Sequence, residues 1–222
     1  MRHSTVEGVF AGKLAILEEG EPTGIFKLPV TGNVLVSTLG LAGDVQADRR
    51  YHGGPEQALN HFPAEHYATL ARLCPQQAPA FVPGSVGENI STRGWDENNV
   101  HIGDIFQAGA AVLQVSQPRS PCWKIDRRFG LTGLSREIAE RAITGWYYRV
   151  LREGLIASGC EFTLLERNPA PVPVFRLWRA HMQAQPDSSE LEQLAVTPGL
   201  NQEWAKKLKD RAEWLRKNSN AA

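Results

Sequence analysis

Short apolar runs, separated by glycine and proline, constrain the fold of this chain more than any other feature. Up to about Glu166 the runs are rich in valine, isoleucine and leucine, as in VFAGKLAIL, NVLVSTLGL, DIFQAGAAVLQVSQ and EFTLLER. Runs of this length and composition predict β-strands. The frequent glycine and proline turns between them favour a curved sheet or a barrel.

Two longer segments interrupt the strand pattern and predict helices. In PEQALNHFPAEHYATLARLC the apolar residues fall near helical spacing, which predicts one helix that is broken or started at Pro63. In GLTGLSREIAERAITGWYYRVLREG, Ser135 followed by Glu137 and Glu140 is a helix start signal. We expect Gly145 to interrupt this second helix.

After Glu166 the proline-rich stretch RNPAPVPVF predicts a hinge, and three helical segments follow. The first places Phe175, Trp178 and Met182 near one face, and the second, SSELEQLA, begins with serines that suit a helix cap. The third repeats apolar residues at helical intervals, namely Leu200, Trp204, Leu208, Ala212 and Leu215. The predicted fold is therefore mainly β with helices (α+β), with a barrel domain at 1–167 and a three-helix subdomain at 168–222.

The charges balance, because 24 lysines and arginines face 24 acidic residues among 222 residues. No net field attracts a nucleic acid polymer or an anionic membrane, so local charges must hold any anionic ligand. No run of 18 or more apolar residues occurs, and the start MRHSTVEGVFAGKLAIL does not resemble a leader peptide. We expect a cytoplasmic protein.

Cysteine usage singles out Cys122 as a reactive group. The three cysteines lie far apart and form no CxxC pair, and we interpret Cys74 and Cys160 as packing residues. Cys122 lies in SQPRSPCWK, where two prolines stiffen the backbone and Arg119 and Lys124 favour the thiolate. A thiolate is a soft metal ligand. The residues alone leave two alternatives, a reactive or ligating thiol and a buried, inert one.

Two further glycine-bearing clusters have the composition of ligand-binding loops. In GDVQADRRYHGG, Gly53 and Gly54 allow close approach of backbone to a ligand, while Arg49 and His52 supply donors; a solvated turn is the alternative. In SVGENISTRGW, Asn89 presents an amide suited to a polar heterocycle, and a simple hairpin turn is the alternative. The HIGD sequence at 101–104 predicts a structural turn.

The ordered series GIFKLPV, GLAGDVQADRRYHGGPEQAL, SVGENIST and HIGDIFQAGAAVLQVSQPRSPCWK, with the helical tail, resembles the MOSC family, named for the C-terminal domain of molybdenum cofactor sulfurase. Within that family the chain is most similar to the bacterial 6-N-hydroxylaminopurine resistance proteins. The resemblance spans roughly residues 5–165 and the tail.

This resemblance implies a β-barrel that binds the molybdenum cofactor, a molybdenum-bearing pterin, with Cys122 as the protein thiolate on the metal. Asn89 and Ser120 match positions that contact the cofactor in relatives. On charge and location, we add four residues as phosphate or pterin contacts: Lys27, Arg49, His52 and Arg119.

The implied activity is the reduction of N-hydroxylated compounds, including purine base analogues, to amines, with detoxification as its purpose. The chain has no iron–sulfur cysteine pattern and no flavin or nicotinamide fingerprint, so a separate reductase is expected to supply electrons. His61, Glu88 or a water are alternative proton donors. Two rival functions remain: a carrier of the cofactor or of persulfide sulfur on Cys122, and a metal-free thiol hydrolase or transferase.

Overall fold

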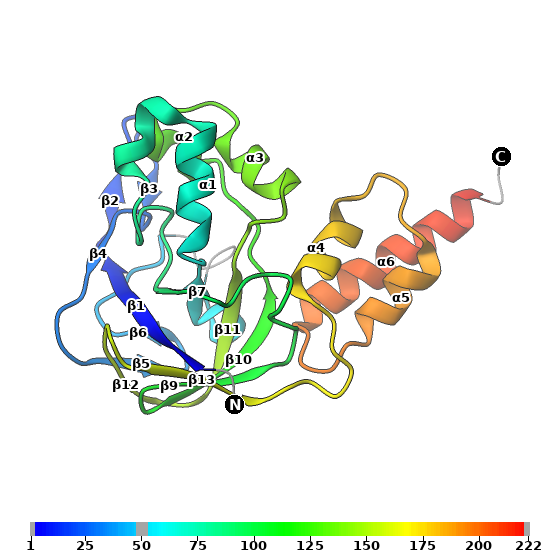
Figure 1. Cartoon of the computed structure of the whole chain (residues 1–222). Helices are drawn as coiled ribbons and strands as arrows, with labels where there is room; N and C mark the ends of the chain where they lie inside the picture. Colours follow the sequence, from blue (N-terminus) through cyan, green and yellow to red (C-terminus); the bar gives the residue numbers. More distant parts are fainter. Residues whose placement is uncertain (1–2, 48–52, 220–222) are drawn as a thin grey trace.

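The computed structural model describes residues 3–47 and 53–219 and contains a closed β-barrel with helices above it and beside it (Figure 1). In the described residues seven strands pair in the order β13-β9-β10-β11-β7-β8-β1, and β1 closes the barrel because it pairs with both β8 and β13. The barrel strands are β1 (His3–Gly12), β7 (Leu59–His61), β8 (Ile90–Thr92), β9 (Ile105–Ala108), β10 (Ala111–Pro118), β11 (Trp146–Arg152) and β13 (Glu161–Glu166). The predicted mainly β fold with helices is confirmed.

Short strands extend this barrel at its edges. β4 (Lys27–Pro29) pairs with the end of β1, β5 (Val34–Ser37) lies between β6 (Gly40–Leu41) and β12 (Gly154–Ile156), and β2 (Ala15–Ile16) pairs with β3 (Pro22–Thr23). These pairings hold the loops at 24–26 and 42–47 against the outer wall of the barrel.

Aromatic rings fill the barrel interior around a buried histidine. The His61 ring stacks on Trp146 at a centroid distance of 4.4 Å, and Phe106 stacks on Phe162 at 4.8 Å. His61 Nδ1 lies 3.1 Å from the Tyr148 hydroxyl, and its Nε2 lies 3.1 Å from Thr92 Oγ1. Both ring nitrogens of His61 therefore have partners without contact with solvent.

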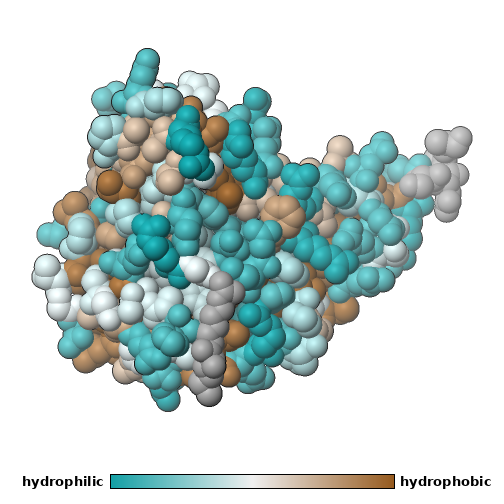
Figure 2. All heavy atoms as spheres, in the orientation of Figure 1, coloured by the Kyte–Doolittle hydropathy of each residue, from teal (hydrophilic) through white to brown (hydrophobic). Residues whose placement is uncertain are grey.

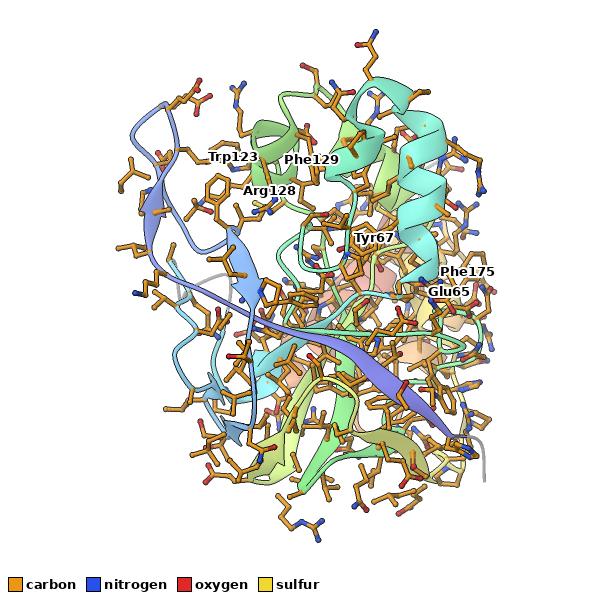
Figure 3. All side chains as sticks on the ribbon, turned by 60° about the vertical axis from the view of Figure 1, so that its left-hand side comes forward. Glu65, Tyr67, Trp123, Arg128, Phe129 and Phe175 are labelled. Atoms are coloured by element: carbon orange, nitrogen blue, oxygen red, sulfur yellow. The ribbon has the colours of Figure 1, made fainter. Side chains whose placement is uncertain are left out.

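Three helices form a cap over one end of the barrel: α1 (Glu65–Leu73), α2 (Lys124–Phe129) and α3 (Leu134–Glu140). Two 3₁₀ segments also occur, Pro55–Gln57 before β7 and Pro75–Ala80 after α1. The cap has its own apolar cluster, which includes Phe62, Leu70 and Ile125. Figure 3 shows Tyr67 on the inner side of α1 and Phe129 on α2. The cap and the barrel therefore have separate apolar cores, which meet where the helices cover the barrel end.

The tail consists of α4 (Val174–Met182), α5 (Ser188–Ala195) and α6 (Gln202–Ser219), which project to one side of the barrel in Figure 1. Its apolar residues join the barrel core in one cluster. The predicted stripe of α6 is confirmed: Leu200, Trp204, Leu208 and Ala212 are buried and Leu215 packs against them. None of the described helices is long and apolar enough to cross a membrane. The division at 167/168 stays a prediction.

Details of the first two tail helices differ from the expectation. In α4 the buried face is Val174, Leu177 and Trp178, whereas Phe175 and Met182 are partly exposed. In α5 the cap is Asp187, whose carboxylate accepts a hydrogen bond from the Ser189 amide, so the serines lie inside the first turn. Asp accepts this bond as well as Ser does.

Of the two alternatives for 55–74, a helix broken at Pro63 or one started there, the structure confirms the start at Pro63, and the residues before it are not helical. Residues Leu59–His61 form β7 between β11 and β8, and α1 begins only at Glu65, just after Pro63. Proline has no amide hydrogen and holds the preceding residue extended, which suits a strand end followed by a helix start.

The helix predicted over 130–154 is wrong in its second half. Only Leu134–Glu140 is helical, and Trp146–Arg152 form β11 in the centre of the sheet. Gly145 separates the two at φ +71°, and an added Cβ there would lie 2.1 Å from the His61 carbonyl oxygen. The aromatic and β-branched residues after it favour a strand once neighbouring strands pair with them.

We predict that Gly145→Ala destabilises the protein far more than Gly130→Ala. Both glycines have positive φ, but a Cβ at Gly130 meets nothing within 4 Å. Gly130→Ala should therefore lower the free energy of unfolding by about 1–2 kcal/mol, the left-handed backbone term alone. Gly145→Ala adds a backbone clash and should lose several kcal/mol, measured by urea unfolding. Equal losses would contradict the close approach.

We also predict that His61 makes the fold sensitive to acid. Burial lowers the pKa of His61 from 6.5 to about 3, so between these values the unfolded chain binds a proton that the folded chain does not. Stability therefore falls as pH falls, by roughly 1.4 kcal/mol per pH unit. His61→Gln should lose roughly 2 kcal/mol less than wild type between pH 6.5 and 5 in urea unfolding.

The matched control is His3→Gln, because His3 is exposed. It should follow the wild-type pH dependence. A His61→Gln variant that loses stability on acidification as steeply as wild type would refute the role of this histidine.

Candidate functional site

An open cleft lies on the outer wall of the barrel, below the helical cap. Its lining comes from the loops at 23–27, 44–47, 87–89 and 119–124, from Gly53 and Gln57, and from two strand side chains, Asn60 on β7 and Tyr147 on β11. The cleft therefore gathers residues from all three clusters that the sequence analysis singled out.

Cys122 lines this cleft between the end of β10 and the start of α2. It is a free, half-buried cysteine, and its carbonyl oxygen accepts a hydrogen bond from the Ile125 amide. The segment is fixed at its other end because the Arg119 amide donates to the Gly145 carbonyl. The backbone on both sides of Cys122 is thus fixed, while Cys74 and Cys160 pack against the two apolar cores, as predicted.

Two cations line the cleft without a carboxylate partner. Arg119 is buried and donates through Nη2 to the Val86 carbonyl at 2.6 Å, and Lys124 Nζ donates to the Pro22 carbonyl at 2.7 Å. Among the residues with described coordinates, no acidic side chain forms an ion pair with either. Their positive charge is available to an anion such as a phosphate.

Lys27 differs from these cations because Asp44 compensates its charge. Lys27 Nζ lies 2.5 Å from Asp44 Oδ2, which also accepts from Asn89 Nδ2 at 2.8 Å, while Asp44 Oδ1 accepts from the Gly12 amide at 2.8 Å. Burial lowers the pKa of Lys27, and the neighbouring Asp44 carboxylate opposes that shift. Asp44 therefore orients two of the predicted contacts, Lys27 and Asn89.

Sequence reasoning missed Asp44, Asn60 and Tyr147. Asp44 stands inside the quoted stretch GDVQADRRYHGG, and this acidic residue next to a glycine was the available signal. Asn60 and Tyr147 are Cα partners on β7 and β11, so their side chains lie side by side on the outer face. Because neither segment was predicted to be a strand, the face of these two residues was not accessible from the sequence.

Tyr147 contributes a phenol to the cleft. It is buried, and burial raises its pKa; the positive charge of Arg119 lowers it and Cys122 raises it, which places both groups near the phenol. Tyr147 therefore keeps its proton at neutral pH. The neighbouring strand residues Trp146 and Tyr148 point into the barrel instead.

The remaining predicted residues are not among the described residues that line the cleft. Ser120 is exposed and is not part of the cleft lining, and Arg49 and His52 lie outside the described residues. His61 is inside the barrel, and the Glu88 carboxylate is buried against the Tyr67 hydroxyl and the Gly84 amide, each at 2.5 Å. Burial raises the pKa of Glu88. Neither His61 nor Glu88 lines the cleft, so the geometry of the cleft does not support either residue as the proton donor.

The chemistry of the lining fits a molybdenum-bearing pterin. Cys122 offers one soft sulfur, and Arg119 and Lys124 offer positive charge for a phosphate. Asn60 adds a buried oxygen, Oδ1, that has no hydrogen-bond partner. No cluster of three or more histidine, cysteine or acidic side chains suited to a metal occurs in residues 3–47 and 53–219.

Comparison with known proteins identifies the family of this chain. The MOSC domain family matches residues 48–163. The protein YiiM of Escherichia coli is 38% identical over 204 residues, which cover 91% of this chain and 90% of YiiM. A reductase of Gibberella moniliformis is 35% identical over 184 residues, which cover 80% of this chain but 32% of that protein.

Solved structures agree with the sequence matches. The crystal structure of YiiM from Escherichia coli superposes with a TM-score of 0.79 at 33% sequence identity, covering 96% of this chain and 93% of YiiM. The likeness thus includes both the barrel and the three-helix tail. On the sequence match and the shared fold, this chain belongs to the MOSC domain family.

Proposed function

We propose that this protein is a molybdenum cofactor-dependent reductase that converts N-hydroxylated compounds, including purine base analogues such as 6-N-hydroxylaminopurine, to amines, and so detoxifies them. The observation that carries the proposal is the single half-buried thiol of Cys122 in a cleft with Arg119 and Lys124, two cations that form no ion pair with a described carboxylate. A relative described as a reductase supports the reaction class.

The reaction R–NHOH + 2 e⁻ + 2 H⁺ → R–NH₂ + H₂O breaks the N–O bond, and the bound cofactor supplies the electrons for it. Cys122 would hold the metal through its thiolate sulfur. Arg119 and Lys124 would hold the phosphate, and the Asn89 amide, oriented by Asp44, would contact the pterin. The cap and the barrel wall keep the interior side of this cleft out of solvent.

Tyr147 is the group in the cleft that we assign as proton donor. Burial keeps its Oη protonated at neutral pH, and it lies near Cys122, where the reacting N–O bond would be. Donation from Oη to the departing oxygen or to the nitrogen, followed by reprotonation from solvent, provides one of the two protons of each turnover.

A separate reductase would supply the electrons. In the Gibberella relative the matched region covers only 32% of the length, so two thirds of that protein consists of other sequence. In the present chain we expect the donor to be another protein. Hydrophilic residues cover most of the tail on the face shown in Figure 2, which favours a transient, polar contact over a permanent apolar one.

We predict that Cys122→Ser folds normally but loses molybdenum and reductase activity. The protein should be purified from a host that makes the cofactor and assayed for metal by mass spectrometry and for reduction of 6-N-hydroxylaminopurine with an added reductase. Cys74→Ser and Cys160→Ser are matched controls that remove thiols outside the cleft, and both should keep metal and activity.

Full metal content and activity in Cys122→Ser would disprove the ligand role. Two other results point to rival functions. Cofactor or persulfide sulfur that binds to Cys122 and transfers to another enzyme, without turnover, would make the protein a carrier. Activity in metal-free protein that alkylation abolishes would make it a thiol enzyme.

We predict that Tyr147→Phe lowers kcat by about 100-fold or more at unchanged molybdenum content, because general acid catalysis contributes on that order. Tyr148→Phe is the control. Tyr148 faces the barrel interior and contacts His61, so its loss should lower stability and leave kcat unchanged. A Tyr147→Phe variant with wild-type kcat would exclude Tyr147 as the proton donor.

A further inference from the structure

Asn60 has an unusual position for a buried amide. Asn60 is only 6% exposed and lines the cleft, yet its Oδ1 has no hydrogen-bond partner. The side chain is nevertheless fixed, because Nδ2 lies 3.5 Å from the Gly87 carbonyl. The backbone is held in both directions, since the Asn60 amide donates to Asn89 Oδ1 and the Asn89 amide donates to the Asn60 carbonyl.

Gln117, a second buried amide on the same face of the sheet, shows how such a side chain is normally hydrogen-bonded. The Cα register of β10, β11 and β7 places Gln117, Tyr147 and Asn60 in one row across the sheet. Gln117 is 5% exposed, much like Asn60, but its Oε1 accepts a hydrogen bond from Asn201 Nδ2 of the tail at 2.6 Å. Two buried amides thus share one face, and one of them lacks the partner that the other has.

An unpaired buried acceptor is unfavourable, by about 1–3 kcal/mol, so folded proteins rarely keep one without a use. Asn60 lines the cleft with its unpaired acceptor buried directly behind the cleft surface, and it lies beside Tyr147, whose phenol is near Cys122. A ligand in the cleft that carries an N–H group would supply the hydrogen bond that Asn60 Oδ1 lacks.

We propose that Asn60 is a ligand-binding residue whose Oδ1 accepts a hydrogen bond from an N–H group of the molecule in the cleft. The inference rests on the proposed function, which provides two sources of that N–H: the pterin ring of the cofactor and the N-hydroxylated amino group of the substrate. Either source selects for a ligand with a free N–H, because a ligand without one leaves the acceptor unpaired.

The test compares Asn60→Leu, Asn60→Asp and Gln117→Leu. In protein from a host without the cofactor, Asn60→Leu should unfold at a temperature equal to or above that of wild type, because it removes an unpaired acceptor. Gln117→Leu should unfold at a lower temperature, because it deprives Asn201 of its partner. This comparison does not depend on the reaction or on the cofactor.

In protein from a host that makes the cofactor, Asn60→Leu should lower ligand binding about tenfold, and Asn60→Asp, which keeps an acceptor, should restore it. A fall in pterin content, read from the fluorescence of the oxidised pterin, identifies the cofactor as the N–H source. Normal pterin content with a raised KM for 6-N-hydroxylaminopurine identifies the substrate. Gln117→Leu should keep normal pterin content and KM.

Lower stability of Asn60→Leu with normal pterin content and normal KM would overturn the inference, because Asn60 would then be a structural amide. If Asn60→Leu does not fold, the smaller Asn60→Ser provides the same readouts, and normal pterin content and KM in it would overturn the inference. Absence of molybdenum and pterin from wild type would overturn the proposed function, while the stability comparison still decides the assignment of Asn60.

Discussion

The pairing of β1 with both β8 and β13 is the constraint on which the rest of the structure depends. A closed barrel has no free edge, and its strands must alternate between an inward and an outward face. On β7 and β11 this alternation sends His61 and Trp146 into the interior and leaves Asn60 and Tyr147 on the wall of the cleft. The inward faces of β7 and β11 therefore form part of the barrel core, and their outward faces form part of the site.

The charged residues of the cleft fall into two groups. One group is held in ion pairs within the protein, and the other can bind an anion. Asp44 ties Lys27 and Asn89 to the β1 backbone, so this part of the wall is close to neutral and rigid. Arg119 and Lys124 each donate a hydrogen bond to a carbonyl oxygen instead of forming an ion pair with a described carboxylate. A carbonyl fixes the direction of a cation without neutralising it, and the positive potential is thereby concentrated beside Cys122. The site combines a soft sulfur and a local positive field on a chain with no net charge.

Local patterns predicted the parts of this protein that local physics controls. The stripe of α6 depends on helical periodicity within one segment, and the setting of Cys122 depends on its adjacent prolines and cations, so both were accessible from the sequence. β11 was mistaken for helix and β7 was not recognised as a strand, because the strand character of both comes from neighbours distant in the chain. Asn60 and Tyr147 were missed for the same reason, since only the register of three strands brings them beside Cys122.

Gly145 has a consequence for how this chain tolerates change during evolution. It marks the point at which the chain leaves the cap and enters β11, with its backbone against the His61 carbonyl. Adding or deleting one residue directly after it would exchange the two faces of β11. Tyr147 would then enter the barrel and a core aromatic would enter the cleft. Side-chain replacements on this wall alter one contact each, whereas a change in length by a single residue would remove the core and the site together.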